Sequence, residues 1–284
     1  MYKRPEKIRI RFKSTDELNR YRGFGIDTDI KINWVIDRET ASLLILVYPE
    51  NFISNTEYPD NKTLVSAVLC TCTGRENFAR QAIREFNNQT WKDKELIIVN
   101  QGEKFLTEEE NITEVLVPSY LHNGAMRNIG DALARGGYIV RVDDDDLYHP
   151  DRFKIQMNAI QETGAPASSF QNIINYVPVE DIAWVRALKC SPGLMMYRNE
   201  GRKYISDLRK SSDTYFMAEH YIGQITTIDN PPEYYIRIWH GINQLTTRKG
   251  LGEWDLKRGE RKNDTGKPVD WDYFEKRIKT LEAA

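Results

Sequence analysis

The sequence has few cysteines, almost no net charge and no long hydrophobic run. Its 284 residues include three cysteines, Cys70, Cys72 and Cys190, which cannot all pair within one chain and lack the partners of a zinc site. A formal net charge of −2 gives no global attraction to nucleic acid or to anionic membrane. No window reaches the roughly 18 apolar residues of a membrane span, and the chain begins without the apolar stretch of a secretory signal. We therefore expect a cytoplasmic protein with reduced thiols and no integral membrane association.

Residues 1–62 predict a small α+β appendage. Strands are expected at 7–13, 30–36 and 42–48, and a capping box at Ser14 predicts a short helix after the first strand. Eight Lys and Arg residues within the first 25 positions make this part basic, which suits a partner with a phosphate backbone. The alternative is an ordinary solvated strand–helix face.

From residue 63 the pattern becomes strand–helix–strand. Continuous apolar runs typical of buried parallel strands alternate with helical segments. Strands are expected at 64–69, 95–99, 114–117 and 138–142, and helices at 76–87, 124–134 and 151–162. The pattern predicts an α/β fold with a mostly parallel sheet.

The pattern after residue 163 is less regular. We expect strands at 168–176, 193–197 and 233–239, a helix at 214–222, a polar loop at 248–268 and a closing helix at 270–281 capped by Asp270. The chain is thus divided into the appendage, an α/β domain at 63–248 with halves 63–162 and 163–248, and a C-terminal loop and helix at 249–284.

Four adjacent carboxylates, Asp143, Asp144, Asp145 and Asp146, directly follow the fourth strand of the α/β domain. In open parallel sheets, ligands bind beyond the carboxyl ends of the strands, where the loop at 70–75 also lies. Adjacent carboxylates repel one another, and a hard divalent cation such as Mg²⁺ or Mn²⁺ relieves that repulsion while phosphate oxygens complete its shell. These residues therefore predict a cation site, with a solvated acidic turn as the alternative.

Four segments, in this order, resemble glycosyltransferase family 2, a large inverting family with the GT-A fold. They are the opening strand and loop at 65–71, the run from Gln89-Thr90 to Val99, the run Gly-Ala-Met-Arg-Asn-Ile-Gly at 124–130, and the acidic loop with Pro150-Asp151 behind it. The resemblance implies a Rossmann-like GT-A fold of the nucleotide-diphospho-sugar transferase type, with helices on both faces of the sheet. It makes 63–162 the donor half of the domain and 163–248 the acceptor half.

The resemblance also assigns roles on the donor side. Thr71 would lie at the nucleotide base and Arg127 near the ribose or diphosphate, with a surface salt bridge as the alternative for Arg127. Arg75 joins them as a donor-binding residue. Asn100 and Gln101 stand where the family has two acids, and an amide oxygen still accepts a hydrogen bond from a uracil N–H, without charge assistance. UDP is therefore the expected nucleotide, with another nucleotide left open.

Within the acidic loop, the resemblance makes Asp143 and Asp145 the Asp-x-Asp pair. Asp145 is the first candidate metal ligand, and Asp143 lies toward the ribose and is a second candidate ligand. Asp144 takes its place at the donor site if the register shifts by one residue. His240, in a segment similar to the family's late Arg-x-His-x-x-Asn stretch, either completes the metal shell or contacts the diphosphate, with a structural role as the alternative.

Ser212-Asp213 stands where the family has Glu-Asp, so Asp213 is the candidate base. An inverting transfer needs one carboxylate within hydrogen-bond reach of the acceptor hydroxyl, to remove its proton. The alternative is that Asp213 caps the helix expected from residue 214, and the two roles can coexist.

The predicted function is a metal-dependent, inverting transfer of a sugar, with Mn²⁺ or Mg²⁺ as cofactor, from a nucleotide-diphosphate sugar to an acceptor glycan or another hydroxyl. One alternative keeps this chemistry and takes a hydroxymethylated DNA base as the acceptor, because the segment at 10–18 resembles leader segments of phage-type transferases and is basic. Alternatives of another class are a nucleotidyltransferase and a non-catalytic GT-A-like binding module.

Overall fold

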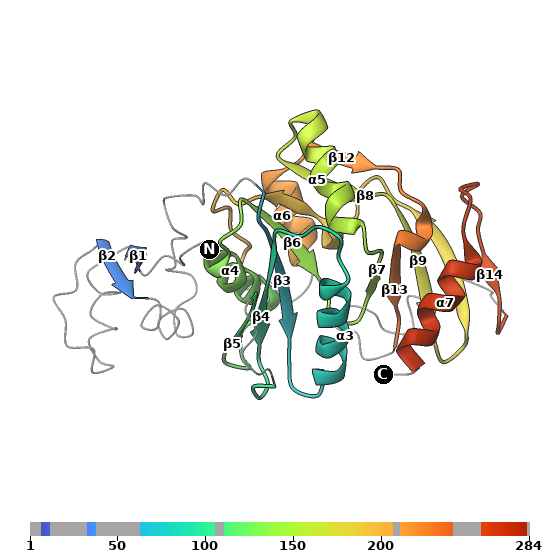
Figure 1. Cartoon of the computed structure of the whole chain (residues 1–284), viewed down its shortest axis with the longest axis horizontal. Helices are drawn as coiled ribbons and strands as arrows, with labels where there is room; N and C mark the ends of the chain where they lie inside the picture. The colour runs from blue at the N-terminus through green and yellow to red at the C-terminus, as the bar shows by residue number, and fades with distance from the viewer. Residues whose placement is uncertain are drawn as a thin grey trace.

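The computed structural model describes residues 63–105, 111–206, 211–240 and 257–282, together with the backbone of two strands nearer the N-terminus (Figure 1). These strands, β1 (Lys7–Arg11) and β2 (Asn33–Asp37), pair antiparallel in a sheet of their own. They correspond to two of the strands expected in the appendage. The helix expected from Ser14 and the strand expected at 42–48 lie outside the described residues, and the boundary at residue 62 stays a prediction.

A seven-stranded sheet forms the centre of the α/β domain, in the order β12-β8-β11-β6-β3-β4-β5. Neighbouring strands run parallel, except that β11 is antiparallel to both β6 and β8. The strands are β3 (Val65–Thr71), β4 (Lys94–Asn100), β5 (Ile112–Leu116), β6 (Tyr138–Val142), β8 (Ala167–Phe170), β11 (Met196–Arg198) and β12 (Ile225–Ile228). The expected mostly parallel sheet is confirmed.

Helices cover both faces of this sheet, as expected. Helices α3 (Glu76–Asn87) and α5 (Arg152–Thr163) pack on the face that carries Ala67 of β3. Helices α4 (Asn123–Leu133) and α6 (Ser212–His220) lie on the opposite face, which carries Val68. Because both faces are covered, β3, β4 and β6 are buried on both sides rather than alternating, and polar residues within them, such as Ser66 and Arg141, are buried as well.

The single strand expected at 168–176 is wrong. The chain forms two strands there, β8 in the larger sheet and β9 (Asn172–Val177) in a second sheet, with Gln171 between them. The Asn230 side-chain oxygen accepts hydrogen bonds from the backbone N–H groups of Gln171 and Asn172, both at 3.1 Å, where the chain changes sheets. Phe170 and Ile173, on either side of Gln171 and Asn172, lie in the same buried cluster, so burial alone does not mark the change of sheet.

The second sheet has five strands in the order β14-β10-β9-β13-β7, and it lies to the right of the larger sheet in Figure 1. Besides β9, it contains β7 (Leu147–Tyr148), β10 (Ile182–Ala187), β13 (Tyr235–Ile238) and β14 (Arg261–Lys262). Strand β13 matches the strand expected at 233–239, and β14 lies in the segment expected to be loop. Strands β7 and β10, like β12 of the larger sheet, were not expected, because they are short or lack regular alternation.

Helix α7 (Trp271–Glu282) covers the second sheet through Phe274 and Ile278. Asp270 caps it as expected, since its Oδ1 atom accepts a hydrogen bond of 2.8 Å from the backbone N–H of Tyr273. Phe274 and Ile278 lie in the same buried cluster as Leu147 of β7, the strand that follows the acidic loop. The last helix is therefore packed against the sheet to which this strand belongs.

Cys70, Cys72 and Cys190 are free thiols, as expected. Burial raises the pKa of the Cys70 thiol to about 12, so this thiol stays protonated at neutral pH. Within the described part of the chain, no helix combines the length and the apolar character that a bilayer crossing requires.

Candidate functional site

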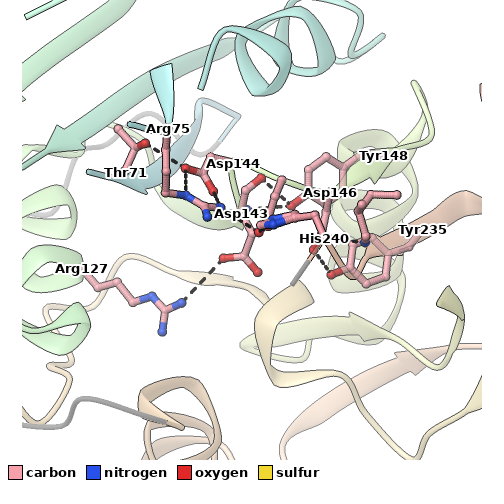
Figure 2. A network of polar contacts seen from close by, with 11 residues as sticks. Thr71, Arg75, Arg127, Asp143, Asp144, Asp146, Tyr148, Tyr235 and His240 are labelled. Atoms are coloured by element: carbon pink, nitrogen blue, oxygen red, sulfur yellow. Dashed lines mark hydrogen bonds and ion pairs between the residues drawn. The ribbon is translucent and has the colours of Figure 1, made fainter. Parts of the chain in front are cut away.

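The carboxyl ends of β3, β4 and β6 meet at one edge of the larger sheet. Leu69 of β3 lies opposite Ile98 of β4 and Val142 of β6, so the residues that follow these positions leave the sheet together. Figure 2 shows the result: side chains from the loop after β3, from helix α4 and from the end of β13 converge on the acidic loop. The parallel register therefore brings the loop after β3 and the acidic loop after β6 to the same edge of the sheet, where the candidate site was expected.

Asp144 is held by the loop that follows β3. The Nε and Nη2 atoms of Arg75 donate to its two carboxylate oxygens at 2.9 and 2.5 Å, and the Thr71 hydroxyl donates to Oδ2 at 2.8 Å. The Asp144 side chain is 6% exposed. Three hydrogen bonds, two of them from a bidentate guanidinium, account for its stability in a buried position.

Asp145 lies between two basic side chains. Its Oδ2 atom is 2.7 Å from Nη2 of Arg75 and 2.8 Å from Nε2 of His240. These contacts hold the pKa of Asp145 below its usual range although its burial acts in the opposite direction. Phe78, near the start of α3, stacks on the His240 ring at 4.6 Å, and the Arg75 guanidinium lies 4.9 Å from the Phe78 ring centre. Two candidate site residues, Arg75 and His240, thus contact the same carboxylate oxygen of Asp145.

Asp146 points away from the others into the second sheet. The Tyr235 hydroxyl donates to its Oδ2 atom, and the backbone N–H of Ile238 donates to Oδ1 at 3.0 Å. Burial raises the pKa of Asp146 well above its ordinary value, and the carboxylates of Asp145 and Asp143 raise it further. Asp146 therefore ties the acidic loop to β13, a role that the sequence did not suggest.

Ion pairs are found for Asp143, Asp144 and Asp145, and Asp143 is the most exposed of these three. Its side chain is 40% exposed. Its Oδ1 atom is 3.8 Å from Nη2 of Arg127. Its backbone N–H donates to the Tyr148 hydroxyl at 2.7 Å, and that hydroxyl in turn donates to the Asp143 carbonyl at 3.2 Å. The backbone of Asp143 is thus fixed from β7 while its carboxylate faces the site.

Arg127 connects the two halves of the domain. Its Nη1 atom is 2.5 Å from Oδ1 of Asp213 and donates to the Ser212 hydroxyl, also at 2.5 Å. Arg127 is buried, so the alternative of a salt bridge on the helix surface is wrong. Helix α6 begins at Ser212, and Asp213 lies in its first turn with its carboxylate on Arg127 rather than over the helix end. The capping role considered for Asp213 is therefore not observed.

Asn100 and Gln101 use their side-chain amides to hold loops. The Asn100 amide nitrogen donates to the Glu103 carbonyl at 2.8 Å and to Glu114 at 2.7 Å, while its oxygen accepts from the backbone N–H of Gly102 at 2.6 Å. The Gln101 amide nitrogen donates to the carbonyls of Pro118 and Leu121. Asn100 lies opposite Thr71 in the register of β3 and β4, and the backbone N–H of Gln101 donates to the Thr71 carbonyl at 3.0 Å. The assignment of both residues to the nucleotide stays a prediction.

The oxygen and nitrogen ligands that a divalent cation would need come from the acidic loop and His240. Among the described residues, no group of three or more His, Cys, Asp or Glu side chains is arranged to hold a metal ion by itself. Asp145 and His240 are in contact, so one carboxylate and one imidazole are available to the same ion. Mg²⁺ is usually held by one or two protein carboxylates, with substrate phosphates and water in the remaining positions. These residues fit a cation shared with a diphosphate and do not fit an all-protein cage.

The sequence of residues 66–228, more than half of the chain, matches the family described as Glycosyl transferase family 2. The chain belongs to this family. The match includes β3, α4, the acidic loop and Asp213, and it stops before β13. The family suggested by the sequence resemblance is thus confirmed.

Several proteins described as glycosyltransferases are similar over part of the chain. An uncharacterized glycosyltransferase of Rickettsia bellii is 26% identical over 153 residues, which are 45% of this chain and 21% of that protein. An uncharacterized glycosyltransferase of Methanocaldococcus jannaschii is 32% identical over 111 residues, 36% of this chain and 38% of that protein. The chain thus spans well under half the length of these relatives.

Two solved structures have a similar chain trace. The S. aureus TarS fragment 1–349 in complex with UDP-GlcNAc is 13% identical, with a TM-score of 0.49 over 63% of this chain and 60% of that one. The mannosyltransferase PcManGT from Pyrobaculum calidifontis, in complex with GDP-Man and Mn²⁺, is 12% identical, with a TM-score of 0.43 over 71% of this chain and 64% of that one.

Sequence reasoning missed four contributors to this glycosyltransferase-family site. Phe78 supports Arg75 and His240, Tyr148 fixes the Asp143 backbone, and Tyr235 holds Asp146. Arg237 lies beside Tyr235, whose hydroxyl accepts from its Nε atom at 3.4 Å. Three of them lie in segments that the family resemblance covers: Tyr148 follows the acidic loop, and Tyr235 and Arg237 belong to the same segment as His240.

Proposed function

We propose that this chain is a metal-dependent, inverting glycosyltransferase that moves a sugar from a nucleotide-diphosphate sugar to an acceptor hydroxyl. The observation that carries the proposal is the position of Arg127, which contacts Asp213 at 2.5 Å and lies 3.8 Å from Asp143. One guanidinium therefore joins a carboxylate of the acidic loop with the candidate base from the other half of the domain. A transfer reaction needs such a convergence, because donor and acceptor must meet in one site.

On the acceptor side, Asp213 is the proposed base. Its carboxylate would accept the proton of the acceptor hydroxyl while the oxygen attacks the anomeric carbon of the sugar from the face opposite the diphosphate. Arg127 positions this carboxylate through an ion pair, and the Ser212 hydroxyl accepts a hydrogen bond from the same guanidinium. Inversion at the anomeric carbon follows from a single displacement.

On the donor side, positive groups are needed where negative charge develops on the departing diphosphate. Arg127 is one such group, and Asp145 with His240 would hold a divalent cation. Bound there, Mn²⁺ or Mg²⁺ would act as a Lewis acid on the phosphate oxygens. Asp143, with its exposed carboxylate beside Arg127, is placed to contact the ribose, and Thr71 to contact the base.

A nucleotide-sugar panel tests the proposal. The full chain is incubated with UDP-, GDP-, ADP-, CMP- and dTDP-sugars, each with Mn²⁺, Mg²⁺ or EDTA, and scored by thermal shift and by hydrolysis of the donor. A ligand present at 100 times its dissociation constant stabilises the folded chain by about 2.7 kcal/mol. We expect stabilisation and slow hydrolysis with one nucleotide class, both lost in EDTA. If no nucleotide sugar stabilises the chain in the presence of metal, the donor assignment is wrong.

The same panel separates the alternatives. A nucleotidyltransferase would release pyrophosphate from a nucleoside triphosphate and leave the nucleotide sugar intact, and a binding module would bind without hydrolysis. A hydroxymethylated DNA base as acceptor depends on the basic segment within residues 1–62, whose side chains lie outside the described residues. It stays a prediction, tested by offering hydroxymethylated and unmodified DNA beside glycan acceptors.

A further inference from the structure

The hydrogen bonds found for the Arg75 guanidinium among the described residues all go to the acidic loop. Its guanidinium makes three hydrogen bonds, two to Asp144 and one to Asp145, at distances of 2.5 to 2.9 Å. Its side chain is 12% exposed. A guanidinium is planar, always charged and only weakly hydrated, so it can neutralise two neighbouring carboxylates at a site from which water is largely excluded. Arg75 therefore does for Asp144 and Asp145 what a bound cation would do.

The Oδ2 atom of Asp145 receives both Arg75 and His240. Phe78 lies against both of these side chains and so holds them at the same oxygen. A divalent cation that binds Asp145 must approach carboxylate oxygens to about 2.1 Å, and two positive charges at the same oxygen would repel each other strongly. Metal binding at Asp145 and the Arg75–Asp145 contact therefore compete.

A displaced guanidinium needs another anion, because an unpaired charge in a largely buried position is costly. The diphosphate of a nucleotide sugar is the anion that arrives at this edge of the sheet in the proposed function, and guanidinium groups bind phosphate oxygens in a bidentate manner. Arg75 lies directly before helix α3 and four positions after β3 ends at Thr71, so its side chain can turn within the loop without disturbing either element.

We propose that Arg75 is a built-in counter-cation, which neutralises Asp144 and Asp145 before the donor arrives and passes to the donor's diphosphate when a divalent cation binds Asp145. The exchange couples the binding of metal and nucleotide. The metal displaces the Arg75 guanidinium from Asp145, and the diphosphate supplies the anion that the displaced guanidinium requires. This inference rests on the proposed function, since it assumes that a metal and a nucleotide diphosphate share the site.

The test measures Mn²⁺ affinity of the full chain by calorimetry, and by the electron paramagnetic resonance signal of free Mn²⁺, with and without saturating UDP or GDP. The variant is Arg75→Ala, and the matched control is Arg80→Ala, which removes one positive charge from the same helix region at an exposed position. Arg75→Gln is measured as well, because it removes the charge and keeps a donor for Asp144, and circular dichroism establishes which variants are folded.

In the wild-type chain we expect weak Mn²⁺ binding that a nucleoside diphosphate strengthens at least tenfold. In Arg75→Ala, Mn²⁺ alone should bind at least tenfold more tightly than in the wild type, and the strengthening by nucleotide should shrink by a similar factor, since the coupling is reciprocal. Arg80→Ala should behave as the wild type does. Should Arg75→Ala fail to fold, Arg75→Gln should show the same changes.

Two outcomes overturn the inference, and they are distinguishable. If nucleotide strengthens Mn²⁺ binding in the wild type but folded Arg75 variants bind Mn²⁺ no more tightly than the wild type, Arg75 is not the counter-cation and the proposed function stands. If neither the wild type nor any variant binds Mn²⁺, with or without either nucleotide, the shared metal site itself is wrong, and the inference fails with it.

Discussion

Arg127 of helix α4 and Asp213 of helix α6 form an ion pair, with 2.5 Å between Nη1 and Oδ1. The two residues belong to different halves of the domain, and both helices lie on the same face of the larger sheet. Arg127 also approaches Asp143. The candidate base is thereby held relative to the acidic loop by a single side chain, so that the proposed transfer depends on the contacts of Arg127 with the first turn of α6.

Replacing the candidate base tests this arrangement directly. Asp213→Asn keeps the size of the side chain and an oxygen for Arg127, but it cannot take up the acceptor proton. We expect kcat for sugar transfer to fall by about 10²- to 10⁴-fold, with donor affinity changed little. Ser212→Ala is the control, because it removes the other partner of Arg127 and leaves the carboxylate. An unchanged transfer rate in Asp213→Asn would show that Asp213 is not the base.

Asp146 should tolerate a neutral isostere. Its raised pKa favours the neutral carboxyl, and an asparagine can accept from the Ile238 N–H through its oxygen and donate to the Tyr235 hydroxyl through its nitrogen. We expect Asp146→Asn to melt within a few degrees of the wild type. Asp146→Ala leaves two buried donors unpaired and should cost about 1–3 kcal/mol in urea unfolding. Equal losses in both variants would mean that the buried charge itself is required.

Gly130 should not accept alanine, although alanine is the better helix former by about 1 kcal/mol. A Cβ atom at this position would lie 2.3 Å from Cγ1 of Val68, where α4 crosses β3. Overpacking of a core costs about 1–3 kcal/mol, so we expect Gly130→Ala to lower the free energy of unfolding by about 1 kcal/mol or more. The double variant Gly130→Ala, Val68→Ala provides the check, because space at Val68 should make the two effects non-additive.

Arg277 should matter more to stability than its place on the last helix suggests. Its Nη2 atom is 2.5 Å from Oε2 of Glu85, a buried acid of α3 whose Oε2 atom also accepts from the Tyr148 N–H at 2.9 Å. Arg277→Ala leaves that buried carboxylate without its cation, and because Arg277 is partly exposed and the Tyr148 N–H remains, we expect a cost of about 1–3 kcal/mol. The exposed neighbour Lys276 supplies the control, since Lys276→Ala should change little in the same urea titration. Adding Glu85→Gln to Arg277→Ala should restore part of the loss.

Much of the first half of the fold could be predicted from the sequence because its signals are local. The helix expected at 76–87 and the strand expected at 138–142 have those bounds in the structure, since buried apolar runs and turn residues mark them. The change of sheet at Gln171 could not be predicted, because it depends on Asn230, far along the chain, and both strands beside it are equally buried.

The same distinction holds for the site. Thr71, Arg75, Asp143, Asp144 and Asp145 lie together as the parallel register requires, and that register follows from the strand pattern. Which cation each carboxylate contacts could not be predicted, because those contacts depend on side-chain directions in the loop before α3, in α4 and just after β13. Asp146 shows the limit most clearly: four identical residues in a row have different partners, and one of them turns into the second sheet.

The family match ends at residue 228, but the attachment of Asp146 does not. Tyr235 and Ile238 hold this acid, and His240 meets its neighbour Asp145, so three contributors to the acidic loop lie downstream of the matched segment. An expression fragment trimmed to that segment would keep the acids and remove their supports. Helix α7 packs on the strand that carries these supports, so for recombinant production or for grafting this site onto another scaffold, the smallest transferable unit is longer than the recognisable motif and runs at least through α7.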